Sequence, residues 1–205
     1  MGEYSLARAL RQSAKALFDS AIDSDLVKRI PVIGLAVELC ETVDNIRARL
    51  FADKLVEFLQ ALDQMTPEAR EKFTEKMAES QEETQKVGET LLLVLEKITA
   101  LDKAQILAYV FIAYTQGRIG SADFRRLADA IDQAFIDDLK ELLNIKPNGR
   151  SQAPYMKHLE RAGLTFADLN KIPRNRQYHH YVISDLGTQL IAAHSAGMAY
   201  CRTSK

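Results

Sequence analysis

Positively charged side chains near the end of the chain are the residues whose type and spacing most suggest a chemistry. Residues 146–205 contain 9 Lys and Arg against 3 Asp and Glu, whereas residues 1–145 contain 18 against 25. A basic segment of this kind attracts phosphate groups. The candidate nucleic-acid contacts are Lys157, Arg161, Arg174 and Arg176. The alternative is that the basic segment docks on the acidic remainder of the chain.

The four histidines and Cys201 lie in the same segment and are candidate metal ligands. The histidines are His158, His179, His180 and His194. Structural zinc sites use closely spaced ligand pairs such as C-x-x-C, which this segment lacks. Adjacent His179 and His180 on a strand would point to opposite faces of a sheet. We therefore predict no metal site and no cofactor.

Signatures of catalysis are absent from the sequence. It contains no Gly-rich phosphate loop, no Ser/His/Asp arrangement and no carboxylate pair near a histidine. The chain is therefore predicted not to be an enzyme. It has two cysteines, no signal-peptide pattern at its N-terminus and no apolar run of the about 20 residues that a bilayer span needs. These features predict a cytoplasmic protein.

The elements that position these side chains are predicted to be mainly helical. Apolar residues recur at helical spacing through residues 5–144, which predicts a bundle of five or six helices with short loops. Pro31 is suited to the first turn of a core helix that buries Leu39. One continuous helix is predicted from Ser121 to Leu143, with Phe135 on its inward stripe.

The composition of the sequence changes after Leu143. "NIKPNGRSQAP" is a connector rich in Pro, Gly and Asn, and "YMKHLERAGL" predicts a short helix ended by Gly163. "QYHHYVIS" is rich in strand formers, and a final helix follows with Ser184 as its N-cap. We therefore predict two regions, a helical bundle over residues 1–145 and a basic region over residues 146–205.

The second region resembles the end of a winged-helix domain. Leu159, Gly163 and Leu164 match the family's "L-x-x-x-G-L", and Tyr181, Ile183, Ser184, Leu186 and Gly187 match its "Y-x-[ILV]-[ST]-x-L-G". The likeness covers about a fifth of the chain and departs from the family in leaving no room for a separate second helix, unless the last helix of the bundle serves as that helix. It implies a recognition helix with Lys157 and Arg161 and a wing with Arg174 and Arg176. The fold class is thus mainly α, a multi-helix bundle with a small winged-helix-like α/β appendage.

The bundle offers more apolar surface than one small core obviously needs, which predicts a homo-oligomer or a protein partner. The candidate interface residues are Leu91, Leu92, Leu93, Leu95, Tyr109 and Phe111. Residues 29–140, with stretches such as "RLFADKLVEFL" and "KVGETLLLVLEKI", also resemble a bacterial family of small helical proteins associated with mobile elements and phage defence. That resemblance implies a context and no chemical role.

Three functions are compatible with these features. The leading hypothesis is a non-enzymatic bacterial protein that acts by interaction or assembly, in phage defence or its regulation. The second is a nucleic-acid-binding transcriptional regulator that uses the basic segment. The third is a membrane-perturbing effector, because Arg8, Arg11 and Lys15 form a basic stripe beside apolar residues of the predicted N-terminal helix.

Overall fold

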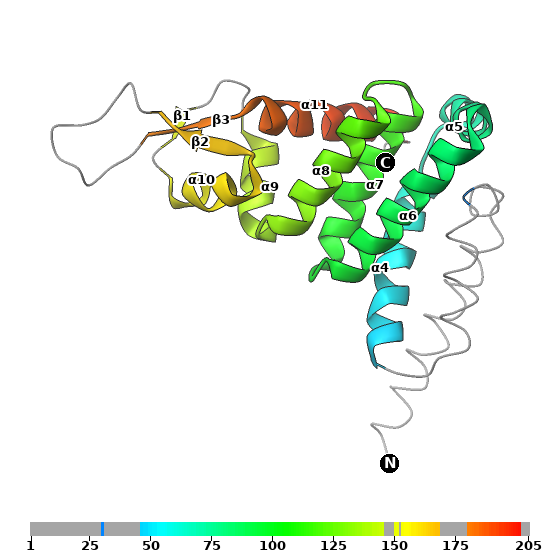
Figure 1. Ribbon diagram of the computed structural model, residues 1–205, viewed down its shortest axis with the longest axis horizontal. Coiled ribbons are helices and arrows are strands. Elements are labelled where there is room, and N and C mark those ends of the chain that lie inside the picture. The colour runs from blue at the N-terminus through cyan, green and yellow to red at the C-terminus, as the bar shows by residue number, and fades with distance from the viewer. Residues whose placement is uncertain (1–29, 31–45, 146–149, 152, 169–179, 202–205) are drawn as a thin grey trace, which may run out of the picture. The chain divides into compact units, whose positions relative to one another are not determined.

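The computed structural model describes residues 30, 46–145, 150–151, 153–168 and 180–201 (Figure 1). These residues form a mainly α-helical chain with a small antiparallel sheet and a final helix toward the C-terminus, which confirms the predicted class. None of the described helices is both long and apolar enough to cross a membrane. The predicted helix from Pro31, with the burial of Leu39, lies outside the described residues.

The chain divides into two compact units. The first comprises residues 1–105 with 201–205, and the second comprises residues 106–200. Helix α7 (Leu101–Thr115) runs from the first unit into the second. The boundary predicted after residue 145 falls inside the second unit and stays a prediction.

The first unit is built from α4 (Ile46–Asp63), α5 (Pro67–Glu79) and α6 (Gln81–Lys97). Its fully buried side chains include Leu55, Phe58, Leu62, Phe73, Leu91 and Leu95. Helix α5 starts at a side-chain cap: Thr66 Oγ1 accepts a hydrogen bond from the Ala69 N–H at 3.3 Å, and Pro67 follows in the first turn. This cap satisfies one of the backbone donors that the helix itself leaves unpaired.

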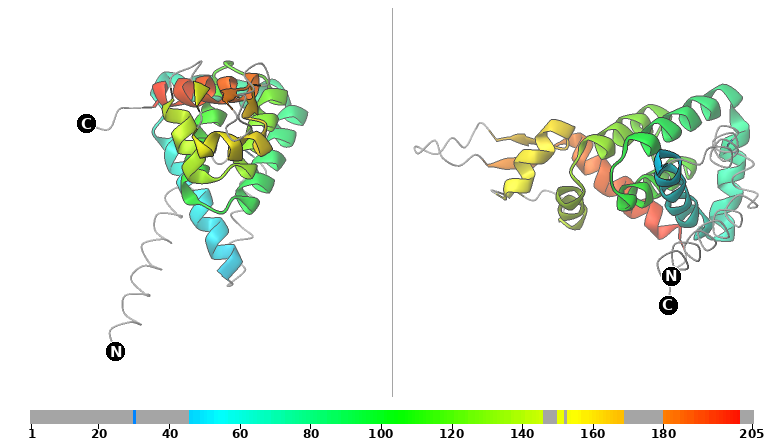
Figure 2. Two further views of the ribbon diagram at one scale, coloured as in Figure 1. Left: turned by 90° about the vertical axis from the view of Figure 1, so that its left-hand side faces the viewer. Right: turned by 90° about the horizontal axis from the view of Figure 1, so that it is seen from below.

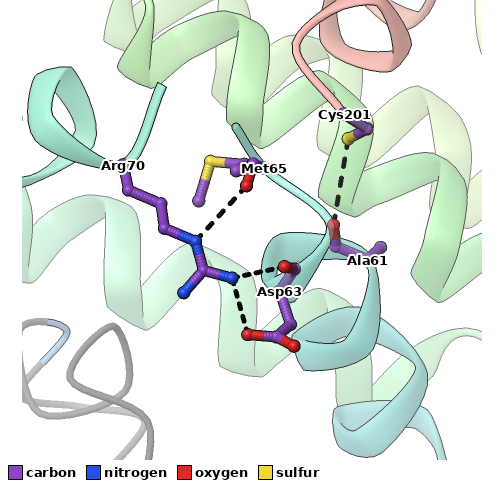
Figure 3. A network of polar contacts seen from close by, with 5 residues as sticks. All are labelled: Ala61, Asp63, Met65, Arg70 and Cys201. Atoms are coloured by element: carbon purple, nitrogen blue, oxygen red, sulfur yellow. Dashed lines mark hydrogen bonds and ion pairs between the residues drawn. The ribbon is translucent and has the colours of Figure 1, made fainter. Parts of the chain in front are cut away.

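Arg70 ties the start of α5 to the end of α4 (Figure 3). Its guanidinium donates to the Met65 carbonyl at 3.3 Å, to the Asp63 carboxylate at 2.7 Å and to the Asp63 carbonyl. Cys201 forms an isolated antiparallel bridge with Met65, and its Sγ lies 3.9 Å from the Ala61 carbonyl oxygen. Partial burial raises the pKa of the Cys201 thiol, so the thiol is kept in its neutral form.

Lys54 is a buried cation at the C-terminal end of α6. Its ammonium group donates to the carbonyl oxygens of Glu96 at 2.8 Å and Ile98 at 2.9 Å. The last carbonyls of a helix have no partner within the helix, and they carry the negative end of its dipole. Lys54 therefore links α4 to the end of α6 by charge-assisted hydrogen bonds.

The helical part of the second unit consists of the rest of α7, α8 (Ser121–Gln133) and α9 (Ile136–Asn144). Its core contains three mutually packed rings, those of Phe111, Tyr114 and Phe124, with centroids 5.6–6.0 Å apart. Gly117, with φ of 70°, ends α7 in the left-handed region that suits glycine.

The single helix predicted from Ser121 to Leu143 is wrong. Ala134 and Phe135 are extended and separate α8 from α9, and the Phe135 side chain is 61% exposed instead of buried. The break lets Leu139 and Leu142 of α9 be buried in a direction that a straight continuation of α8 would not give. No Pro or Gly marks the break, so tertiary packing overrides local helix propensity here.

A small sheet follows α9 in the second unit. It contains β1 (Arg150–Ser151), β2 (Thr165–Ala167) and β3 (Tyr181–Ile183) in the antiparallel order β1-β3-β2, so that Phe166 lies opposite Val182. Helix α10 (Pro154–Leu159) and the 3-10 turn η1 (Glu160–Ala162) stand between β1 and β2. Helix α10 packs alongside β2 and β3, as the further views also show (Figure 2).

The last helix, α11 (Asp185–Ala199), makes close backbone contacts at both of its ends. Ser184 caps it as predicted, because its Oγ accepts from the Gly187 N–H at 3.0 Å and also donates to the Gly163 carbonyl at 2.6 Å. A Cβ atom at Gly187 would lie 2.2 Å from the Leu164 carbonyl oxygen, and one at Gly197 would lie 1.9 Å from that of Tyr109. Both positions therefore require glycine.

Candidate nucleic-acid interface

Helix α10 is positioned by its own apolar residues. Met156, Leu159 and Ala162 are buried, and Pro154 occupies the first turn. The turn ends at Gly163, whose φ of 71° confirms the predicted helix stop. The buried Thr165 hydroxyl donates to the Met156 carbonyl at 2.5 Å and thereby ties α10 to β2.

The opposite side of α10 carries charged residues that face solvent. Lys157 of α10 and Arg161 of the following turn η1 are both exposed and lie four residues apart. Exposed Glu160 and His158 flank them. The structure thus leaves two of the four predicted nucleic-acid contacts exposed to solvent, on α10 and on the turn that follows it.

The other two predicted contacts cannot be placed. Arg174 and Arg176 belong to the connection between β2 and β3, which lies outside the described residues. The same holds for Lys146, Lys171, Arg202 and Lys205, so six of the nine basic residues of the region are outside the described part. The predicted contribution of Arg174 and Arg176 therefore stays a prediction.

His158 and Asp138 form a contact that the sequence did not reveal. The imidazole Nδ1 lies 3.0 Å from Asp138 Oδ2 of α9. The His158 side chain is 61% exposed, whereas that of Asp138 is only 13% exposed. The contact joins α9 and α10, which also pack directly on one another. Twenty residues and two secondary-structure boundaries separate the pair, so no local spacing pattern points to it.

Among the described residues, His158 and His194 have different partners. His158 contacts Asp138, whereas the ring of His194 packs edge-on against Tyr109 with centroids 5.3 Å apart. Burial holds the pKa of the His194 imidazole at about 4, well below its ordinary value. Within the described residues, no three His, Cys, Asp or Glu side chains are placed to hold a metal ion. His179 lies outside those residues.

The fold buries some residues of the predicted oligomer interface and exposes others. Leu91, Leu95 and Phe111 are fully buried in the chain's own cores, whereas Leu93 is 57% exposed. Leu92 and Tyr109 are half-buried. Leu93 is therefore the candidate with the most surface to offer a partner, and the interface itself stays a prediction.

Apolar surface that the sequence analysis missed lies on the sheet. Phe166 of β2 is 50% exposed. Neighbouring Thr165 is buried and bonds to α10, and successive strand residues point to opposite faces, so Phe166 faces away from α10. The strand is only three residues long, which is too short for an alternation signal in the sequence.

Comparisons of the chain with protein-family models, curated proteins and solved structures give no match. The geometry of the site therefore has to carry any functional argument by itself.

Proposed function

We propose that this chain is a nucleic-acid-binding protein that uses the outward face of α10. The observation that carries the proposal is that Lys157 of α10 and Arg161 of η1 are both exposed, while buried Met156, Leu159 and Ala162 fix the other side of this segment. Cations on a rigid helix can meet successive phosphates without losing as much conformational freedom as cations on a loop.

The order of elements supports the proposal. Helix α10 ends at Gly163, a hairpin of β2 and β3 follows, and β3 leads through Ser184 into α11. This is the order that the resemblance to winged-helix domains implies, with α10 as the recognition helix. The chain departs from that family because α10 and η1 alone stand between β1 and β2. If the proposal holds, α9 takes the place of the missing helix.

The net charge of the site is compatible with nucleic-acid binding, although its positive excess is small. Glu160 lies beside Lys157 and Arg161, so the described turn of helix has a small positive excess. Basic residues in the connection between β2 and β3 would add to it, since its sequence contains Lys171, Arg174 and Arg176. Attraction to phosphates would then be shared between helix and connection.

A fluorescence-anisotropy titration at low salt tests the proposal. The full chain is titrated with labelled duplex DNA and single-stranded oligonucleotides, and the test variant combines Lys157→Ala with Arg161→Ala. Loss of two phosphate contacts should weaken duplex binding at least about tenfold and flatten the log–log salt slope by up to about 1.8. If these side chains also reach base edges, the preference between sequences should fall as well.

A matched control distinguishes binding at the proposed site from attraction by the overall positive charge of the surface. Lys86→Ala combined with Arg126→Ala removes two cations that are 60% and 72% exposed on α6 and α8. This control should change affinity far less than the test variant. Equal losses in both variants, or a flat titration with every oligonucleotide, would reject the proposal.

Protein assembly, which is the leading hypothesis from the sequence, is the second candidate function here, and exposed Leu93 in the leucine row of α6 favours it. A setting in phage defence rests on the sequence resemblance alone. Light scattering at micromolar concentration should give more than the monomer mass for the wild-type chain and the monomer mass for Leu93→Glu. A monomeric wild type would count directly against assembly.

A further inference from the structure

His158 lies in sequence between the two proposed cationic contacts, Lys157 of α10 and Arg161 of η1. It follows Lys157 in α10, and its side chain is 61% exposed. The ring is nevertheless held on one side, because Nδ1 lies 3.0 Å from the mostly covered carboxylate of Asp138. An exposed histidine that is fixed in this way presents its other nitrogen in a defined direction.

The chemistry of the contact decides which ring nitrogen carries a proton. An ionised carboxylate can only accept hydrogen bonds, so Nδ1 must donate to Asp138. In the neutral ring Nε2 is then an acceptor, and in the charged ring Nε2–H is a second donor. Within the described part of the chain Nε2 has no hydrogen-bond partner. The nitrogen that remains available is therefore the one on the exposed side.

We propose that His158 is a third phosphate contact, beside Lys157 and Arg161, and that Asp138 is the residue that positions it. The proposal rests on the proposed function and adds a regulation to it. A phosphate oxygen carries no proton to donate, so only the charged ring can bond to it through Nε2–H. Binding then takes up one proton at Nε2 and is stronger in mildly acidic solution.

Charged residues lie on both helices that meet at the ring; besides Asp138, α9 carries exposed Asp137, Lys140 and Glu141. Asp138 is the only ionic partner of the ring among the described residues, and it comes from α9. On its own helical turn the neighbours are Lys157, Glu160 and Arg161, all exposed. A phosphate that bridges Lys157 and His158 would compensate the repulsion between the two cations, so the ligand itself favours the charged ring.

Salt dependence at two pH values measures this contact directly. Each neutralised phosphate contributes about 0.9 to the log–log slope on duplex DNA. The wild-type chain should therefore have a slope steeper by up to about 0.9 at about pH 6 than at about pH 8, together with about tenfold tighter binding at low salt. In His158→Gln both differences should disappear. In Lys157→Ala the slope should fall equally at both pH values.

Asp138→Ala distinguishes positioning from bulk charge. Removing a carboxylate makes the chain more positive, which by itself should tighten binding to DNA. If Asp138 positions the ring, the variant should bind more weakly than the wild type at about pH 6 and at least as tightly at about pH 8. Circular dichroism at both pH values would verify that the variant is folded.

The outcomes separate this inference from the proposed function. No binding at either pH would reject both. Binding that depends on Lys157 and Arg161, but with the same pH difference in the wild type and His158→Gln, would overturn the role of His158 alone. Tighter binding by Asp138→Ala at both pH values would overturn the positioning role of Asp138.

Discussion

The contact between Gly197 and Tyr109 gives the sharpest stability prediction. Helix α11 crosses α7 with no room for a side chain, since a Cβ atom at Gly197 would lie 1.9 Å from the Tyr109 carbonyl oxygen and 2.6 Å from its carbonyl carbon. Comfortable contact needs about 3.5 Å. In Gly197→Ala the two backbones would have to separate by about 1.5 Å at this point. That shift would also loosen the edge-on contact of His194 with Tyr109.

The sign of the change in unfolding free energy on Gly197→Ala distinguishes a steric clash from ordinary helix propensity. In an open helix interior, Gly→Ala stabilises by up to about 1 kcal/mol. Overpacking typically costs about 1–3 kcal/mol, and the weakened ring contact about 0.5–1.5 kcal/mol more. We therefore expect Gly197→Ala to lower the free energy of unfolding by about 1–3 kcal/mol. Far-UV circular dichroism in urea would measure it.

A control on the same helix makes the measurement decisive. Ser195 is exposed, so Ser195→Ala changes helix propensity without touching α7. It should raise stability slightly or leave it unchanged, by at most about 0.5 kcal/mol. If Gly197→Ala were as stable as the wild type or more stable, the close approach of the two backbones would be refuted.

Two further predictions concern a buried histidine and a buried lysine. The pKa of His194, about 4 in the folded chain, lies below its ordinary value of 6.5, so the unfolded chain binds the proton more readily. The contribution of the neutral His194 ring to stability is therefore complete above about pH 6.5, and up to about 3 kcal/mol of it is lost as the pH falls toward about 4. The urea midpoint of His194→Phe should fall less than that of the wild type over the same pH range. Lys54→Met should cost about 1–3 kcal/mol in urea unfolding, because the carbonyls of Glu96 and Ile98 lose their charged donor. An unchanged midpoint would show that water replaces the ammonium group.

Local signals in the sequence predicted helix ends well. Gly163 and Ser184 each act through their immediate neighbours, by a left-handed turn and by a side-chain cap. Such features depend on a few adjacent residues, so they can be identified before the fold is known.

Features that depend on distant residues could not be predicted in this way. The break at Phe135 has no local breaker, and it exists because α9 packs in a different direction from α8. From the sequence alone Gly197 is an ordinary weak helix former, and its need to be glycine follows only from the Tyr109 backbone that packs against it. For the candidate site, the exposure of Lys157 and Arg161 follows from the helical period, whereas the partnership of His158 with Asp138 follows only from the packing of α9 on α10.

The lack of clearance at Gly187 couples the last helix to the sheet mechanically. Leu164 touches the Gly187 position, its carbonyl accepts the Ser184 N–H at 3.0 Å, and the Ser184 hydroxyl bonds to Gly163. Neither β2 nor the start of α11 can move away without breaking all three contacts at once. The amide protons of Ser184 and Gly187 should therefore exchange with solvent in one shared opening event, so that strand and helix form a single cooperative unit of local unfolding.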